Sequence, residues 1–240
     1  MATLVPELPS ERPENFVDDL AGMGSFFIDP SGAARYVFRK WFWIGPLIVV
    51  TIVSVIAGYM LMPIVQHVLE VSPLPPNVSP EQYQRVVNVS IIVQRVTMFC
   101  APVITAFLFA VQALILFAMC SITSVAAKFK PLWNLVAGCW LIQVLASIAS
   151  VVIVRSKGDI STAAELRPAL GLDIFMPEGA NKFLVGFMGY FSVFQIWWMV
   201  MMVLVLSSAF RISKARALIV ALPLFLLGLI LRVGGAAFQR

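Results

Sequence analysis

The chain has 240 residues, of which 60% are hydrophobic and 12% are charged, and its mean hydropathy is +0.94. Soluble globular domains carry about 25% charged residues, so this composition excludes an ordinary soluble domain and predicts an integral membrane protein. The 17 Lys and Arg residues exceed the 12 Asp and Glu residues and give a net charge of +5. This charge suits contact with anionic lipids, but the sequence lacks the dense basic stripe that would predict nucleic-acid binding.

Residues 1–28 are predicted to form a flexible cytoplasmic tail. The first 24 residues are polar and acidic and contain Pro6, Pro9 and Pro13. They lack the basic segment followed by an apolar core that marks a cleavable signal peptide. We therefore expect the first membrane span to serve as the anchor.

A helix is predicted over about residues 30–42. Asp29 and Pro30 stand in the order of a helix N-cap and a first helical residue. Aromatic and small side chains then alternate with basic ones, which is typical of an amphipathic helix in the headgroup region of a membrane. The alternative is an aromatic belt that leads into the first span. The candidate contacts with the lipid interface are Arg35, Arg39, Lys40, Trp41 and Trp43.

Five apolar stretches reach the length of about 20 residues that crosses a bilayer as a helix. They cover about residues 44–66, 96–124, 132–154, 183–210 and 217–235. None of them contains Asp or Glu, and backbone groups in lipid must pair within their own segment, which favours helices. The predicted fold class is therefore all-α: a polytopic membrane protein with five transmembrane helices after the amphipathic helix, forming one membrane domain over residues 29–240.

Two long segments, 67–95 and 155–182, are predicted to be structured outer loops. Ser79-Pro80-Glu81-Gln82 has the pattern of a capping box, so the second helix is predicted to begin outside the membrane. Thr162-Ala163-Ala164-Glu165 predicts another short helix, which Pro168 would end. Each loop can be a docking surface or a cap over the bundle.

Basic residues in the short connections predict the orientation of the chain. Lys128 and Lys130 lie in one short connection, and Arg211, Lys214 and Arg216 lie in another. The positive-inside rule then predicts a cytoplasmic N-terminus and an outer C-terminus. Together with reduced cysteines and no cleavable signal, this favours a bacterial inner membrane, with a eukaryotic endomembrane as the alternative. Two further arginines, Arg155 and Arg232, would reach the outer interface by snorkelling.

Polar and small residues inside the spans are candidates for contacts between helices. Gln112, Gln143 and Gln195 are candidate polar intramembrane contacts, because an unpaired amide in lipid costs several kcal/mol. The alternative is a polar lining for a lipid or substrate groove. The candidate helix-packing residues are Ala106, Ala110, Ala113, Gly186 and Gly189. The bulky surface of Met199, Met201 and Met202 can face core, lipid or a partner helix.

Catalytic and metal-binding patterns are missing. His67 is the single histidine, and Cys100 and Cys120 are about 30 Å apart if they share one helix. No zinc spacing or phosphate-binding loop occurs, and the spans hold no acid for ion coupling. We therefore predict no catalytic residue, metal or cofactor, and a protein that is not an enzyme.

Short motifs in the chain resemble the Yip family, the Ypt/Rab-interacting-protein domain, in its bacterial form. They are Phe26-Phe27-Ile28-Asp29-Pro30, Trp41-Phe42-Trp43-Ile44-Gly45-Pro46, the run from Phe191 to Trp198, and Ser213-Lys214-Ala215-Arg216-Ala217. The resemblance covers about residues 25–235 and implies five spans with a cytoplasmic N-terminus. The Asp-Leu-Tyr-Gly-Pro segment of eukaryotic relatives is absent, so the resemblance implies architecture rather than Rab binding.

The favoured hypothesis for function is a non-enzymatic membrane scaffold or accessory subunit. It would bind protein partners within or beside the bilayer, through its spans and outer loops. The alternative is a lipid or small-molecule permease without ion coupling, in which the three glutamines share a cavity. A third hypothesis is membrane shaping by the basic aromatic helix. The expected partners are membrane lipids and either other membrane subunits or further copies of this chain, and no nucleic acid.

Overall fold

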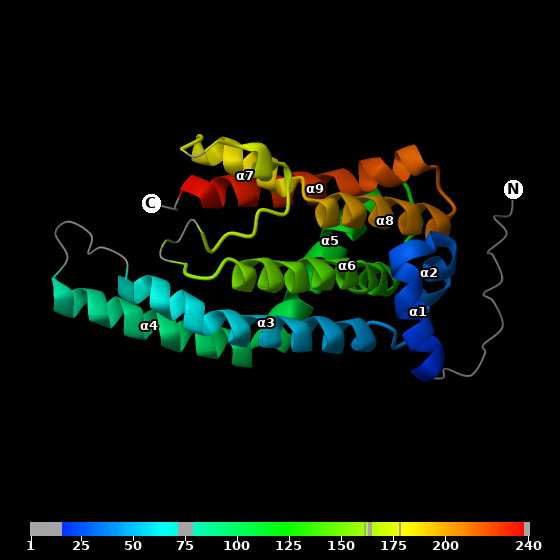
Figure 1. Cartoon of the computed structure of the whole chain (residues 1–240). Coiled ribbons are helices and arrows are strands. Elements are labelled where there is room, and N and C mark those ends of the chain that lie inside the picture. Colours follow the sequence, from blue (N-terminus) through cyan, green and yellow to red (C-terminus); the bar gives the residue numbers. More distant parts are fainter. Residues whose placement is uncertain (1–15, 72–78, 161, 163–164, 178, 238–240) are drawn as a thin grey trace, which may run out of the picture.

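The computed structural model describes residues 16–71, 79–160, 162, 165–177 and 179–237. Within these residues the chain is all-α, with nine α-helices, one short 3₁₀ helix and no strand. Two helices cap one end of a bundle, and a helical pair protrudes beyond the bundle at the other end (Figure 1). The bundle confirms the predicted fold class, while the helices that precede it differ from the prediction.

Two short helices, α1 (Phe16–Ile28) and α2 (Pro30–Tyr36), precede the first span. Residues 16–28 were expected to be flexible and are instead helical, because Met23 and Phe26 are buried against the bundle. The first 15 residues of the predicted tail lie outside the described residues. Helix α2 begins as predicted, with the Asp29 carboxylate accepting hydrogen bonds from the backbone N–H groups of Ser31 and Gly32.

The predicted helix over 30–42 is too long. Helix α2 ends at Tyr36, since the carbonyls of Val37 and Arg39 accept hydrogen bonds from the Asn134 side chain, at 2.9 and 2.6 Å, instead of continuing the helical ladder. The Arg39 guanidinium pairs with Asp19 at 2.5 Å and so faces α1 rather than lipid headgroups. Arg39 and the buried Phe42 therefore make contacts within the protein, and the predicted amphipathic helix over 30–42 is not confirmed.

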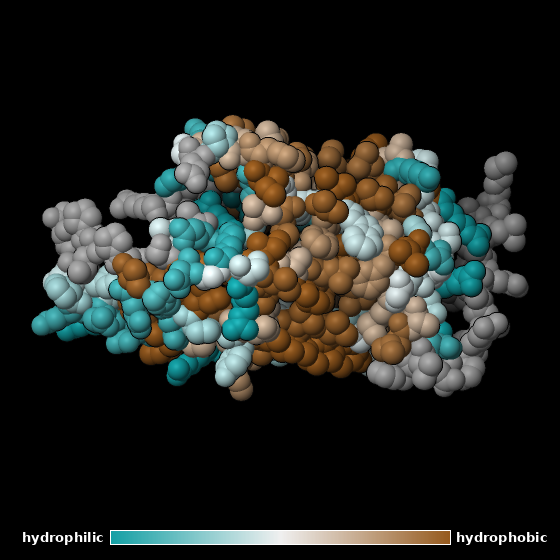
Figure 2. Space-filling model, in the orientation of Figure 1, coloured by the Kyte–Doolittle hydropathy of each residue, from teal (hydrophilic) through white to brown (hydrophobic). Residues whose placement is uncertain are grey.

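Five helices are long and apolar enough to cross a membrane. Their bounds are α3 (Ile44–Val71), α5 (Ala101–Ile122), α6 (Phe129–Ser156), α8 (Val193–Phe210) and α9 (Lys214–Ala237). Figure 2 shows hydrophobic side chains in a belt around the middle of the molecule and hydrophilic ones toward both ends. This belt matches the hydrocarbon layer of a bilayer, so the five helices indicate an integral membrane protein.

Helix α4 (Pro80–Phe99) precedes the second span as a separate helix. Its capping box is present as predicted, with Ser79 and Gln82 bonding each other's backbone N–H groups. The predicted span over 96–124 is interrupted at Cys100, because Pro102 has no N–H with which to continue the ladder. Helix α4 therefore packs along the end of α3 and protrudes from the bundle (Figure 1).

The predicted fourth span, 183–210, is two helices rather than one. Helix α7 (Lys182–Tyr190) ends before Phe191, and α8 begins after Ser192. The Ser192 hydroxyl accepts a hydrogen bond from the Gln195 N–H at 3.1 Å and so caps α8. Helix α7 packs against α9 (Figure 1), and its short length leaves α8 as the membrane-crossing part.

The loop between α6 and α7 folds back on the bundle. It contains the 3₁₀ helix η1 (Leu172–Phe175) and a bridge between Gly171 and Ser192. Of the short helix predicted from Thr162, residues 163–164 lie outside the described residues, and the Glu165 N–H bonds to the Thr162 carbonyl at 3.1 Å. The described part of the second outer segment is therefore structured.

The main core centres on α6 and includes buried residues of α1, α2, α3, α5, α8 and α9. The Phe26 ring is completely buried and stacks on Phe42 with 5.3 Å between ring centroids. It also lies directly on the backbone of Gly138 in α6, where a Cβ would stand 2.3 Å from the ring. Glycine is therefore required at position 138 for this close approach of ring and helix.

We expect Gly138→Ala to lower the free energy of unfolding by about 1–3 kcal/mol, because the new methyl group overpacks against Phe26. Thermal unfolding in a mild detergent measures this loss, and proteolysis of α1 should become faster. Gly24→Ala is the matched control, since nothing lies within 4 Å of a Cβ at Gly24. If a Phe26→Leu change added to Gly138→Ala restored no stability, the steric explanation would be wrong.

Candidate functional site

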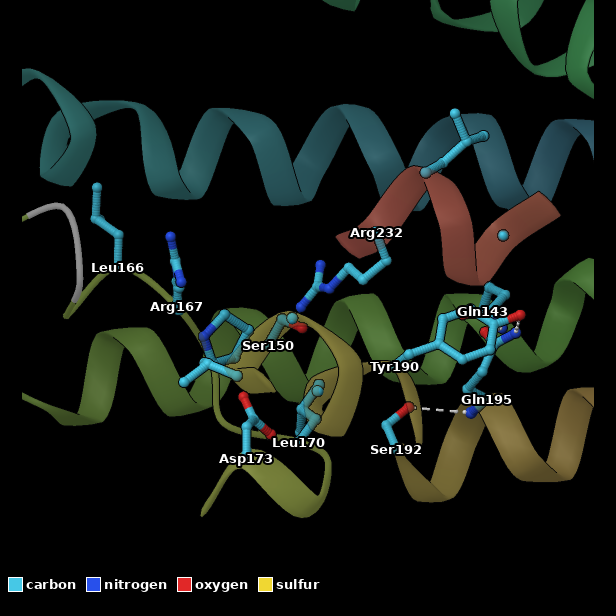
Figure 3. Close-up of a pocket in the computed structure, with 16 residues that line it drawn as sticks. Gln143, Ser150, Leu166, Arg167, Leu170, Asp173, Tyr190, Ser192, Gln195 and Arg232 are labelled. Atoms are coloured by element: carbon cyan, nitrogen blue, oxygen red, sulfur yellow. Dashed lines mark hydrogen bonds between the residues drawn. The ribbon is translucent and has the colours of Figure 1, made fainter. Parts of the chain in front are cut away.

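A pocket of about 680 Å³ lies between α6, α7, α8, α9 and the loop after α6 (Figure 3). A volume of this size is typical of small-molecule sites. Charged side chains lie toward one end of the pocket in Figure 3, with Ser150 beside them, and the Gln143 and Gln195 amides and the Tyr190 and Ser192 hydroxyls lie toward the other. The residues that line it are Gln143, Ser150, Leu166, Arg167, Pro168, Leu170, Asp173, Val185, Gly186, Gly189, Tyr190, Ser192, Gln195, Gly228, Leu231 and Arg232.

The uncharged end is a chain of hydrogen bonds that joins four helices. The Gln143 amide of α6 donates to Gln195 Oε1 of α8 at 3.1 Å. The Gln195 amide in turn donates to the Tyr190 hydroxyl at 3.2 Å, and that hydroxyl donates to the Phe225 carbonyl of α9 at 2.7 Å. Tyr190 reaches α9 because Gly228 has no side chain, and a Cβ there would stand 2.9 Å from the tyrosine oxygen.

The charged end brings together residues from two distant parts of the chain. Arg167 and Asp173 come from the loop after α6, and Arg232 comes from the last turns of α9. A Cβ at Gly189 would stand 3.2 Å from Asp173 Oδ2 and 3.7 Å from Arg232 Nη2, so both groups border the same space. Among the described residues, neither arginine side chain has an ion pair or a hydrogen bond.

The loop that supplies this charge is held tightly against the end of α7. Asp173 Oδ1 accepts a hydrogen bond from the Gly171 N–H at 3.1 Å. A Cβ at Gly171 would stand 2.9 Å from the Gly189 carbonyl and 3.0 Å from the Met188 carbonyl, both of which are backbone groups. Glycine at 171 therefore fixes the position of Asp173 at the pocket.

The three glutamines do not share one site. Gln143 and Gln195 meet at the pocket, whereas Gln112 accepts a hydrogen bond from the Trp140 indole N–H at 2.9 Å, away from the pocket lining. Each of the three amides has a partner on another helix. The pocket is also lined by Arg167, Asp173, Tyr190 and Arg232. Of these four residues, the sequence analysis placed only Arg232 at the outer interface of the membrane.

The candidate packing residues fall into two groups. Ala113 of α5 is fully buried in the main core, and Ala106 and Ala110 are half-buried on the same helix. Gly186 is buried and Gly189 half-buried, and both line the pocket on α7. These glycines thus lie beside the pocket rather than within a long transmembrane helix.

The candidate interface residues also divide. Arg35, Lys40 and Trp41 are exposed, and the Trp41 ring has the Lys130 ammonium 5.4 Å from its centroid. Trp43 is half-buried and packs edge-on against Trp133 at 5.8 Å, while Arg39 is paired with Asp19. Contact of the exposed members with lipid headgroups stays a prediction.

The Tyr190 hydroxyl joins α7, α8 and α9, so we expect Tyr190→Phe to lower the free energy of unfolding by about 1 kcal/mol. Thermal unfolding in detergent measures the change. Tyr59→Phe is the control, because Tyr59 is 74% exposed on α3. Equal losses in the two variants would contradict a special role for the Tyr190 bonds.

Comparisons with known proteins identify the family. The model of the Yip1 domain matches residues 23–234, which is nearly the whole chain. No curated protein and no solved structure matches the chain. The matched region begins within α1 and includes four candidate spans, nearly all of the fifth, and the pocket. The family match therefore applies to nearly the whole described bundle, and the chain belongs to the Yip1 domain family.

Proposed function

We propose that this protein is a non-enzymatic integral membrane scaffold or accessory subunit that binds protein partners within or beside the bilayer. The observation that supports this proposal is the outward face of α4. That helix packs chiefly against α3, with Val87 buried and the Tyr83 hydroxyl bonded to the Leu69 carbonyl at 2.5 Å. Its opposite face carries exposed apolar residues, which are Val86, Val89, Ile92, Val93, Val96 and Phe99.

The spacing on α4 favours a partner helix. Val86, Val89, Val93 and Val96 repeat every three and four residues, so they form one continuous seam. Helix α4 also carries Arg85 and Arg95 and is not among the helices apolar enough to cross a membrane alone. A face that is apolar on a polar helix fits a protein partner better than it fits bulk lipid.

The methionines of α8 contribute less to this proposal than the sequence suggested. Met201 and Met202 are buried in the main core, and Met199 is half-buried against it. Their soft side chains therefore serve internal packing. We place the partner surface on α4, and we propose a bacterial inner membrane, with the N-terminus in the cytoplasm and the C-terminus outside, as the setting.

A photo-reactive residue at position 89 should capture a protein partner in cells that express the chain at its native level. The same residue at position 52 is the control, because Ile52 is exposed on the membrane-spanning part of α3. We expect Val89→Asp to release the partner in a gentle-detergent pull-down, whereas Asn88→Asp, on the same helix, retains it. Recovery of the wild-type chain alone and monomeric would refute the scaffold proposal.

The second candidate function is a lipid or small-molecule permease without ion coupling. The observation that favours it is the pocket, which reaches Gln143 and Gln195 inside two candidate spans. Since Gln112 lies elsewhere, the proposed route involves two glutamines rather than three. The described lining residues include no acid at this deep end, so a proton or cation carrier of the usual kind is missing from the lining.

Purified protein in liposomes should move a fluorescent short-chain phospholipid between leaflets without an ion gradient. We expect Gln195→Leu to raise that rate severalfold, because it breaks the hydrogen-bond chain at the deep end. Gln112→Leu is the matched control, as it removes an intramembrane amide outside the pocket. Absence of any flux above that of empty liposomes would remove the permease candidate.

A further inference from the structure

We propose that the charged end of the pocket binds the phosphate of a membrane lipid headgroup, and that Asp173 favours headgroups with a primary ammonium group. This proposal rests on the pocket being a ligand site, as in the second candidate function. It does not require that the ligand crosses the membrane. The residues that carry it are Arg167, Asp173 and Arg232, which face the same end of the pocket (Figure 3).

The two arginines supply the phosphate site. A guanidinium presents several N–H donors in a plane that matches phosphate oxygens, and such charge-assisted bonds are about twice as strong as neutral ones. Arg232 and Arg167 approach the pocket from α9 and from the loop, so one phosphate can lie between them. Because their side chains have no partner among the described residues, no existing ion pair has to break first.

Asp173 supplies the preference among phosphate lipids. The Gly171 N–H occupies its Oδ1, while Oδ2 borders the space beside Gly189 that Arg232 Nη2 also borders. Yet no ion pair within 4.0 Å joins Asp173 to Arg232 in the described part of the chain. Two positive charges and one negative charge complement a headgroup with a phosphate and an ammonium group, since each ligand charge then meets its opposite.

The position of the pocket points to a lipid rather than a soluble phosphate. Arg232 lies 18 residues after Lys214 on α9, which is about 27 Å along the helix and close to the thickness of the hydrocarbon layer. The headgroup would therefore lie at the membrane boundary. Leu227 and Leu231 are exposed on the same turns of α9, so acyl chains can follow the outer surface of the bundle.

Native mass spectrometry of the full-length protein in detergent tests the proposal. The probes are dioleoyl-phosphatidylethanolamine, dioleoyl-phosphatidylglycerol, dioleoyl-phosphatidylcholine, dioleoylglycerol and glycerophosphoethanolamine, the last as the soluble source of the same headgroup. We expect retention of the ethanolamine lipid above the glycerol and choline lipids, and no retention of dioleoylglycerol. Stronger binding of the soluble headgroup than of the lipid would overturn the lipid assignment.

Variants locate the site. Arg232→Gln and Arg167→Gln should each weaken binding of every phosphate lipid by about tenfold, the usual effect of losing one charged hydrogen bond. Asp173→Asn should leave the glycerol lipid bound and remove the preference for ethanolamine. Arg155→Gln is the matched control, because Arg155 is an exposed arginine at the end of α6 that does not line the pocket.

The outcomes separate this proposal from the proposed functions. Equal losses in Arg155→Gln and Arg232→Gln would assign binding to general surface charge and overturn the site. Unchanged selectivity in Asp173→Asn would overturn the role of that carboxylate. Lipid retention without lipid flux would support the site and remove the permease candidate. The lipid-binding and flux results are both independent of whether α4 captures a protein partner. Size-exclusion profiles of each variant show whether it folds, and the two arginine variants test the site independently.

Discussion

The contact between the Phe26 ring and the backbone of Gly138 fixes the end of the bundle on which the other helices depend. Gly138 lies four residues after Asn134, so both are on the same face of α6. The Phe26 ring packs on the backbone of Gly138, and the Asn134 side chain donates two hydrogen bonds to the segment between α2 and α3. The Trp197 indole adds a bond to the Phe27 carbonyl at 2.9 Å. The motifs that resemble the family thus form a structural joint between the N-terminal helices and the spans.

The same helix connects this joint to the pocket. Gln143 and Ser150 follow Gly138 on α6, within about 18 Å along one continuous helix. Helix α6 is the most buried of the five candidate spans, so it provides a rigid axis for both regions. Helix α8 makes a second connection, because Trp197 at the joint lies two residues after Gln195 at the pocket. A change at the joint can therefore reach the pocket through α6 and through α8.

Local sequence signals predicted the parts of the fold that local chemistry determines. The Asp29 and Ser79 caps and the five apolar helices need only neighbouring residues and hydropathy. The break after Tyr190 was missed, because an apolar run does not change in hydropathy where Ser192 caps a new helix. The bonds from Asn134 that end α2 were also missed, since they join residues 97 and 95 positions apart. Asp173 and Arg232 are likewise far apart in the sequence, so local signals could not predict that both border the space beside Gly189.

The polarity of the pocket limits what it can do. Its charged groups lie at the boundary end, and its deep end is bordered by the three hydrogen bonds that join Gln143, Gln195, Tyr190 and the Phe225 carbonyl. In the proposals above, the pocket selects a headgroup by charge, and passage beyond it requires these bonds to open. Intramembrane hydrogen bonds contribute about 0.6 kcal/mol each on average, so opening three of them costs about 2 kcal/mol. That cost corresponds to an open fraction of roughly one in thirty. Selective binding at the boundary and slow passage through the deep end are thus compatible in one pocket, and the hydrogen-bond chain rather than the charged end would set the rate.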